Sequence, residues 1–217
     1  GKTAFALNLA RNAAVEFGHG VAIFSLEMTN VELTDRLIAS ESGISADKLK
    51  GKIKMVPEEW VVLEQSLKKL VKAPLYIDET PGITLTDFVA KARRLVREKG
   101  VEVIFVDYLQ LMHSGKPQSG GFSKVQEVTE ISNTLKTTAK DLKVPIIALA
   151  QLNRNLMSRA GSNGKPVLSD LKDSGSIEQD ADMVIFIHRP GMLGMSEDLS
   201  EAEIIIAKNR SGQVGSI

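Results

Sequence analysis

Residues 101–107 read VEVIFVD, a run of mainly β-branched and aromatic residues that ends on an aspartate. Strands buried on both faces have this composition, and they are typical of parallel sheets covered by helices. A carboxylate at the end of such a strand is the arrangement of a Walker B motif, in which it holds the hydration shell of Mg²⁺ against a nucleotide. An aspartate that only caps a turn fits Asp107 equally well on this segment alone.

Similar apolar runs recur along the chain and alternate with amphipathic stretches. We expect strands at about residues 21–27, 75–80, 101–112, 144–152, 183–189 and 202–209. Helical periodicity predicts helices at residues 4–17, 31–42, 58–71, 85–99 and 125–142. The alternation predicts an α/β fold with a mostly parallel central sheet and helices on both faces.

Local signals mark helix starts and long loops. Capping-box spacing predicts two helix starts, at Thr29 with Glu32 and at Ser123 with Gln126. Two segments, 113–122 and 153–176, show neither helical nor strand periodicity. Both follow predicted strands, at the sheet edge where open α/β folds bind ligands. Long loops in that place are candidates for function.

Composition limits the class of protein. The 217 residues include 43% hydrophobic residues, enough for one sizeable core, and we predict a single domain over residues 1–217. Lys and Arg number 27, as do Asp and Glu, so the net charge is zero and no global field can hold a polyanion. The lack of cysteine excludes disulfides and thiolate zinc sites, and three scattered histidines argue against a histidine metal cluster. Without a signal-peptide layout or a long apolar run, the protein is expected to be soluble and cytoplasmic.

The chain opens with Gly1, Lys2 and Thr3 directly before an apolar helix. The last three residues of a phosphate-binding P-loop, G-x-x-x-x-G-K-S/T, meet their helix in this way. There the backbone N–H groups cradle phosphate, the lysine neutralises the outer phosphates and the hydroxyl ligates Mg²⁺. The first glycine of the loop and the strand before it are not in this chain, so either it is a fragment or the P-loop interpretation is wrong.

Four other polar side chains have both a functional and a structural interpretation. Glu27 ends a strand and could polarise an attacking water as general base, or it could be an acid that favours the dipole of the next helix. Gln151 could contact a γ-phosphate or merely end its strand. Lys208 and Arg210 point the same way from a strand end, so they could reach one phosphate together or lie in an ordinary solvated turn.

Six segments, taken in order, carry a resemblance over essentially the whole chain. They are GKT at 1–3, SLEM at 25–28, IFVDYLQLM at 104–112, ALAQLNR at 148–154, LKDSGSIEQDADMVIFIHRP at 171–190 and IAKNRSG at 206–212. Together they resemble the C-terminal RecA-like domain of the DnaB family of bacterial replicative DNA helicases. The resemblance implies a RecA-like P-loop NTPase fold that lacks its first strand here. It also implies a hexameric motor that hydrolyses ATP at subunit interfaces and moves 5′ to 3′ along single-stranded DNA.

The resemblance assigns roles in the nucleotide site to matching positions. Gly1, Lys2 and Thr3 would bind the phosphates of ATP, and Thr3 would share Mg²⁺ with Asp107. Glu27 would activate the attacking water.

Four further positions match residues that act around the nucleotide or between subunits. Gln151 would couple the nucleotide state to the DNA loops. Lys208 and Arg210 would act in trans on the nucleotide of the adjacent subunit, with Arg210 as an arginine finger. Arg36 matches an arginine near the nucleotide, on the helix that follows SLEM.

The stretch Lys172-Asp173-Ser174-Gly175 matches the DNA-backbone loop of the family, in which Lys172 and main-chain N–H groups would meet phosphate. Many relatives carry Arg-Glu in place of Lys172-Asp173, so this chain keeps the charges and loses the bidentate fork of arginine. Six copies of one small loop can give salt-dependent binding without a basic domain. The lack of aromatic residues in the stretch argues against base stacking there and against sequence preference.

The resemblance also identifies parts of the family that are not in this chain. They are the N-terminal helical domain, which engages primase, and the linker helix that docks on the next subunit. Primase and a helicase loader are therefore implied as partners of the complete protein. We expect the 217-residue chain alone to bind ATP poorly and not to unwind DNA, and without the docking helix it is free to remain monomeric.

Three alternatives remain open. A RecA-like recombinase or branch-migration ATPase would share the strand-end carboxylates, although SLEM and KNRSG favour the helicase. A KaiC-like ATP-dependent assembly switch would be oligomeric but indifferent to DNA. An α/β binding domain without catalysis is the only interpretation that composition supports by itself.

Overall fold

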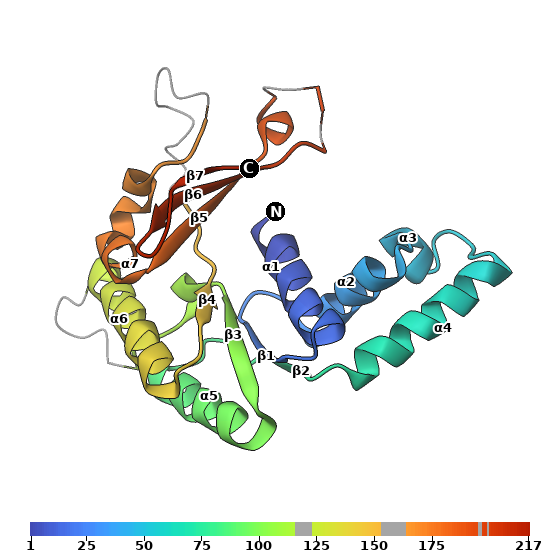
Figure 1. Ribbon diagram of the computed structural model, residues 1–217, viewed down its shortest axis with the longest axis horizontal. Coiled ribbons are helices and arrows are strands. Elements are labelled where there is room, and N and C mark those ends of the chain that lie inside the picture. Colours follow the sequence, from blue (N-terminus) through green and yellow to red (C-terminus); the bar gives the residue numbers. More distant parts are fainter. Residues whose placement is uncertain (116–122, 153–163, 195–196, 199) are drawn as a thin grey trace. The chain divides into compact units, whose positions relative to one another are not determined.

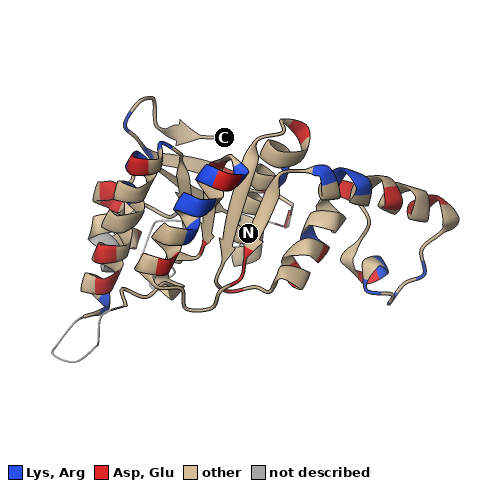
Figure 2. Cartoon of the chain, turned by 90° about the horizontal axis from the view of Figure 1, so that it is seen from below, with Lys and Arg blue, Asp and Glu red and all other residues tan. Residues whose placement is uncertain are grey.

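The computed structural model describes residues 1–115, 123–152, 164–194, 197–198 and 200–217, and over 172–175 it describes the backbone alone. The chain forms two compact units, Gly1–Gly115 with Thr138–Ala150 and Lys116–Thr137 with Gln151–Ile217, and each contains its own sheet (Figure 1). Charged residues lie mainly on the helices, while the strands carry few of them, as buried strands require (Figure 2). Among the helices in these ranges, none combines the length with the apolar content that crossing a membrane requires.

The first unit holds a four-stranded parallel sheet in the order β2-β1-β3-β4. Its strands are β1 (Gly20–Ser25), β2 (Leu75–Asp78), β3 (Val101–Asp107) and β4 (Ile146–Ala148). β1 is buried at every residue, as a strand covered on both faces should be. Ser25 of β1 pairs with Asp107 of β3, so the carboxyl ends of these two strands lie side by side.

Helices cover both faces of this sheet (Figure 1). They are α1 (Lys2–Arg11), α2 (Asn30–Ser42), α5 (Leu85–Lys99) and the last residues of α6 (Lys124–Leu142), whereas α3 (Ala46–Leu49) and α4 (Pro57–Lys72) contact α2. Successive side chains of a strand point to opposite faces, and β1 shows the result. Ile23 packs in the hydrophobic cluster with residues of α1 and α2, whereas Phe24 meets Phe88 of α5 with ring centroids 4.8 Å apart. The predicted parallel sheet with helices on both faces is confirmed.

The second unit contains a three-stranded antiparallel sheet in the order β5-β6-β7. Its elements are β5 (Met183–His188), β6 (Glu203–Asn209), β7 (Gly215–Ser216), α7 (Gly175–Asp180), 3₁₀ helices at Leu168–Ser174 and Pro190–Leu193, and α6 up to Thr137. The strands expected at 183–189 and 202–209 do form, but they pair antiparallel and do not extend the parallel sheet. A parallel pair needs a crossover, usually a helix, and the described part of the connection between β5 and β6 contains only one short 3₁₀ helix.

The strand expected at 101–112 is shorter than predicted. It ends at Asp107, and a 3₁₀ helix at Leu109–Leu111 follows. Leu109 is buried, and its N–H donates to the carbonyl of Leu149 at 3.0 Å. The apolar run therefore continues past the strand because it stays inside the protein, not because it stays extended.

Other boundaries differ in smaller ways. The helix expected at 4–17 begins at Lys2 and passes into a π-helix at Asn12–Glu16. The strand expected at 144–152 contains only the three residues of β4, and α3 was not predicted. Both predicted capping boxes form.

Candidate functional site

Helix α1 brings the first residues of the chain to the carboxyl end of the parallel sheet. Ala6, Leu7 and Ala10 share one helical face, and they are buried in the cluster that contains residues of β1 and β3. The first helical hydrogen bond runs from Phe5 N to Gly1 O at 3.0 Å. The N–H groups of the first turn thus lie at an end of the helix that favours an anion.

Asp107 is the buried carboxylate of this site, with 4% of its surface exposed. Neither carboxylate oxygen accepts a hydrogen bond from any described residue, although the Asp107 carbonyl accepts one from Leu26 N at 2.8 Å. Lys2 Nζ lies 3.9 Å from Oδ1, which is beyond hydrogen-bond length. Because buried polar groups are normally hydrogen-bonded, these two oxygens are open to a ligand from outside the described chain.

Lys2 lies between Asp107 and the ring of Tyr108, with Nζ 3.7 Å from the ring centroid. An aromatic face attracts a cation at this distance. The peptide bond between Asp107 and Tyr108 is cis. Burial lowers the pKa of Lys2, and the negative charges of Asp107 and Glu27 oppose that shift. Both acids therefore lie within electrostatic reach of one ammonium group.

Glu27 lies in a tight turn between β1 and α2. The turn is closed by Ser25, whose Oγ donates to Met28 O at 2.7 Å and accepts from Met28 N at 3.3 Å. Glu27, at its tip, is exposed. The acid in the first turn of α2 is Glu32, which completes the capping box with Thr29. Glu27 is thus not part of the first helical turn, and its carboxylate faces solvent beside the Lys2 site.

A small hollow beneath this edge is lined by Thr3, Ala6, Leu7, Ile23, Leu33, Phe105, Asp107 and Leu149. All but Thr3 and Asp107 are apolar, so the hollow belongs to the core and is not a cleft of nucleotide size. It nevertheless shows that the Thr3 and Asp107 side chains border the same space. A hydroxyl and a carboxylate without donors fit Mg²⁺, a hard cation that binds few protein oxygens and keeps water or phosphate as its other ligands. Among the described residues no group of three or more His, Cys, Asp or Glu could hold a metal, so protein ligands alone would not complete such a site.

Arg36 is exposed on α2. The hydrogen bonds that Thr29 makes lower the pKa of Glu32 most, and the positive charge of Arg36 adds to the effect. The Arg36 charge therefore lies within electrostatic reach of Glu32, one helical turn earlier, and the nucleotide role of Arg36 remains a prediction.

Lys208 and Arg210, at the end of β6, bind the carboxyl end of α7. Lys208 Nζ donates to the carbonyl oxygens of Glu178 at 2.5 Å and Gln179 at 3.3 Å. Arg210 Nη2 donates to the Gln179 carbonyl at 2.8 Å, and its Nη1 lies 3.4 Å from Oδ1 of Asp182. Cations are favourable at a helix C-terminus. The two side chains therefore both bind carbonyl oxygens at the end of α7, and their role in trans remains a prediction.

The remaining predicted residues also belong to the second unit. Gln151 is exposed. Lys172 and Asp173 lie in a 3₁₀ helix and Gly175 begins α7, but the side chains of this stretch are outside those described, as are residues 116–122 and 153–163 of the two predicted functional loops. The structure thus brings together Lys2, Thr3, Glu27 and Asp107, and the nucleotide roles of Gln151, Lys208 and Arg210 remain predictions.

Three residues of these sites were not predicted from the sequence. Tyr108 holds Lys2, Ser25 closes the turn that presents Glu27, and Asp182 contacts Arg210. Tyr108 and Ser25 directly adjoin strand-end acids or their turn, which is a usable signal. Asp182 lies far from Arg210 in sequence, and only the pairing of β5 with β6 brings them together.

Comparisons with known proteins agree with this geometry. The family model described as "DnaB-like helicase C terminal domain" matches residues 1–217. The replicative DNA helicase DnaB of Geobacillus stearothermophilus is 46% identical over 219 residues, which cover 100% of this chain and 47% of that protein. The replicative DNA helicase DnaC of Bacillus subtilis is 44% identical over the same shares. The chain spans about half the length of these curated relatives.

Two solved structures have the same fold. One, described as an ATPase domain, has a TM-score of 0.90 and 34% identity, covering 100% of this chain and 75% of that one. A DnaB-like replicative helicase, described together with its interactions with primase, has the same TM-score and identity and covers 100% of this chain and 51% of its own. The fold is that of a RecA-like ATPase domain.

Proposed function

We propose that this chain, which belongs to the family of DnaB-like helicase C-terminal domains, is the ATP-hydrolysing motor domain of a replicative DNA helicase. The observation that carries the proposal is the buried Asp107 carboxylate, which has no hydrogen-bond donor among the described residues and lies beside Lys2. A site of this kind, in a chain that matches the family from end to end, is best explained by a nucleotide and its metal. The complete protein would be a hexamer that moves 5′ to 3′ along single-stranded DNA, and the two units would form one RecA-like domain.

In the proposed reaction each residue near Asp107 has a separate task. Lys2 and the first-turn N–H groups bind the phosphates, and Glu27 accepts the proton of the attacking water. Thr3 and Asp107 would hold Mg²⁺, which neutralises charge on the phosphate oxygens when it is bound. Glu27 suits a base because it is exposed, so water can reach it. It also lies within electrostatic reach of Lys2, which is proposed to bind the phosphates.

Between subunits we propose that Arg210 and Lys208 reach the nucleotide of the adjacent copy. Gln151 would report the state of the γ-phosphate to the DNA-binding loops, and Arg36 would lie near the nucleotide. Lys172, Asp173 and Gly175 would bind the DNA backbone. Primase and a helicase loader are the proposed partners, and the primase interaction described for one structural relative supports the first.

The test is the substitution Glu27→Gln in the complete protein. It removes the base while keeping size and hydrogen bonding, so hydrolysis should fall by at least about 100-fold with nucleotide binding retained. Glu102→Gln is the matched control, because Glu102 is an exposed acid of β3 that pairs with His19 instead. Hydrolysis by Glu27→Gln at the rate of the control would refute the assigned base.

A second measurement separates the motor from a DNA-indifferent switch. The ATPase rate of the complete protein is measured with and without single-stranded DNA, and a motor that translocates on DNA should be stimulated. An unchanged rate would favour a KaiC-like switch. Strand exchange without unwinding of a forked duplex would favour a recombinase.

A further inference from the structure

Asp182 connects two cations in the second unit. Its Oδ1 lies 3.4 Å from Nη1 of Arg210, and its Oδ2 accepts a hydrogen bond from Lys136 of α6. The main chain adds a contact, because Arg210 N donates to Asp182 O at 2.9 Å. Asp182 directly precedes β5 and Arg210 directly follows β6, so this contact joins the ends of two paired strands.

The contacts of Arg210 fix the direction of its guanidinium plane. A guanidinium carries five N–H donors in a rigid fork. Among the described residues Arg210 directs one donor of Nη1 to Asp182 and one of Nη2 to the Gln179 carbonyl. Three N–H groups are then left for an acceptor that these residues do not supply. Since the side chain is 52% exposed, such an acceptor can come from outside the subunit.

Lys136 determines how Asp182 acts. It binds the second carboxylate oxygen and is itself only 21% exposed, so it anchors Asp182 to α6. It also shares the negative charge, so that the three groups together retain one net positive charge. Arg210 is therefore oriented without being neutralised, which is what an arginine that must face phosphate requires.

We propose that Asp182, anchored by Lys136, is a positioning residue that holds the Arg210 guanidinium for phosphoryl transfer on the nucleotide of an adjacent subunit. The inference rests on the proposed function, because it needs Arg210 to act in trans. Its consequence is a loss of turnover, not of nucleotide affinity, when Asp182 changes.

The experiment measures steady-state hydrolysis of ATP by the complete hexameric protein on single-stranded DNA. Arg210→Ala should lower kcat on the order of 10³-fold. Asp182→Asn should lower kcat roughly tenfold, because a misplaced group loses orientation, while KM changes less than about twofold. In the Arg210→Ala background the Asp182→Asn substitution should have no further effect, since residues that act as one unit are not additive.

The matched control is Asp180→Asn. Asp180 closes α7 and binds Ser132 of the same helix α6 at 2.7 Å, so it shares the location of Asp182 without contacting Arg210, and its kcat should stay within about twofold of wild type. Lys136→Met tests the positioning role from the other side of Asp182, because it removes the anchor of that carboxylate. It should lower kcat several-fold, and this loss too should vanish in the Arg210→Ala background.

The two proposals fail differently. Equal losses in Asp182→Asn and Asp180→Asn, or additive losses with Arg210→Ala, would overturn the positioning role and leave the role of Arg210 intact. Full-rate hydrolysis by Arg210→Ala would overturn the role in trans and the positioning role with it.

Discussion

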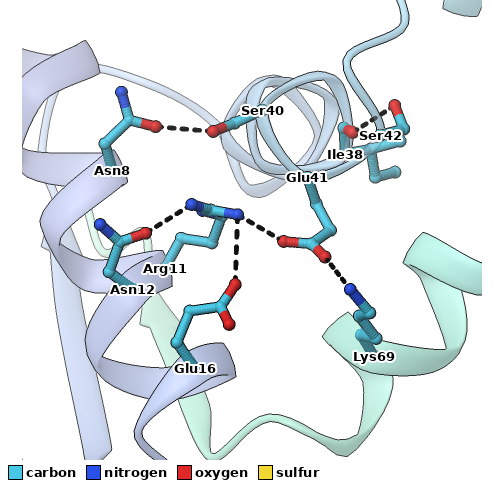
Figure 3. Close-up of polar contacts among 9 residues, drawn as sticks. All are labelled: Asn8, Arg11, Asn12, Glu16, Ile38, Ser40, Glu41, Ser42 and Lys69. Carbon is cyan, nitrogen blue, oxygen red and sulfur yellow. Dashed lines mark hydrogen bonds and ion pairs between the residues drawn. The ribbon is translucent and has the colours of Figure 1, made fainter.

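Two buried carboxylates in the first unit, Glu41 and Asp107, have opposite surroundings. Glu41 has 3% of its side chain exposed and accepts hydrogen bonds from Arg11 at 2.6 Å and Lys69 at 3.0 Å (Figure 3). It thereby ties α2 to α1 and α4. Asp107 accepts no hydrogen bond from the described residues. Glu41 is therefore a structural acid, whereas Asp107 carries an electrostatic cost that a ligand would relieve.

Replacing Glu41 by Gln should destabilise the protein by about 2 kcal/mol, because hydrogen bonds to a charged group are lost from a buried position. Burial raises the pKa of Glu41, but the hydrogen bonds from Lys69 and Arg11 outweigh it, so the pKa lies below its ordinary value of 4.5. A carboxyl with a lowered folded-state pKa stabilises the protein above the unfolded pKa, and that stability is lost as the pH falls through the folded value.

Urea unfolding of wild type and Glu41→Gln should therefore show the full difference at pH 7 and a shrinking difference below pH 4.5. Glu16→Gln is the control. Glu16 is more than half exposed and lies 3.8 Å from the same Arg11, so its loss should cost less than about 0.5 kcal/mol. A difference that grows on acidification would contradict the assigned direction of the pKa shift.

Asp107→Asn should separate stability from activity. Removing a buried charge that accepts no hydrogen bond from the described residues, and that Lys2 approaches only to 3.9 Å, should stabilise the protein by about 1 kcal/mol in the absence of nucleotide and metal. Hydrolysis should fall at least about 100-fold, because the proposed metal ligand is lost. Thermal unfolding and ATPase rate, measured on the same preparation, check both parts. A destabilised variant would show that Lys2 and Asp107 form a structural ion pair.

At the scale of elements, the sequence predicts most where one period dominates. The predicted helix 85–99 agrees with α5 at both its first and its last residue. Phe88 and Ala92 recur on its apolar face, and a glycine follows its last residue. The pairing of β5 with β6 was missed, because an apolar run looks the same whether its neighbours are parallel or antiparallel. In the site, the position of Asp107 at the end of a strand could be predicted from the sequence. The contacts of Lys2 with Tyr108 and of Asp182 with Arg210 could not, because they depend on packing between distant segments.

The start of β1 depends on a close approach between backbones. Gly20 pairs with Val101, and a Cβ on Gly20 would lie 2.3 Å from the Gly100 carbonyl oxygen, a backbone atom that cannot swing away. Gly20→Ala should therefore destabilise the protein by about 3 kcal/mol through overpacking.

The control for Gly20→Ala is Gly215→Ala, because a Cβ at Gly215 would meet nothing within 4 Å. Its effect should stay within about 0.5 kcal/mol. Both are measured as shifts of the denaturant midpoint at constant m-value. Equal midpoints would mean that β1 and β3 can separate at this point without cost.

For the whole molecule, charge balance limits how DNA can be held. With 27 basic and 27 acidic residues the chain has no net field, so a polyanion must be bound through local contacts. If the complete protein is a hexamer, one small loop repeated around the ring supplies several such contacts at once. We propose that Lys172 makes this DNA contact in each copy.

Lys172→Ala therefore gives a prediction for the assembled protein. The binding constant for a single-stranded oligonucleotide falls with salt, and each neutralised phosphate contributes about 0.7 to the slope of log K against log salt. With six loops engaged, the substitution should reduce that slope by up to about 4. Fluorescence anisotropy over a range of salt concentrations measures this slope, with a non-hydrolysable ATP analogue present to hold one state.

The control for Lys172→Ala is Lys165→Ala. Lys165 is paired with Glu203 at 2.8 Å, and its loss should leave the slope unchanged. An unchanged slope together with an unchanged affinity for Lys172→Ala would place the DNA contacts elsewhere. A loss in affinity with the same slope would indicate that Lys172 supports the loop without touching phosphate.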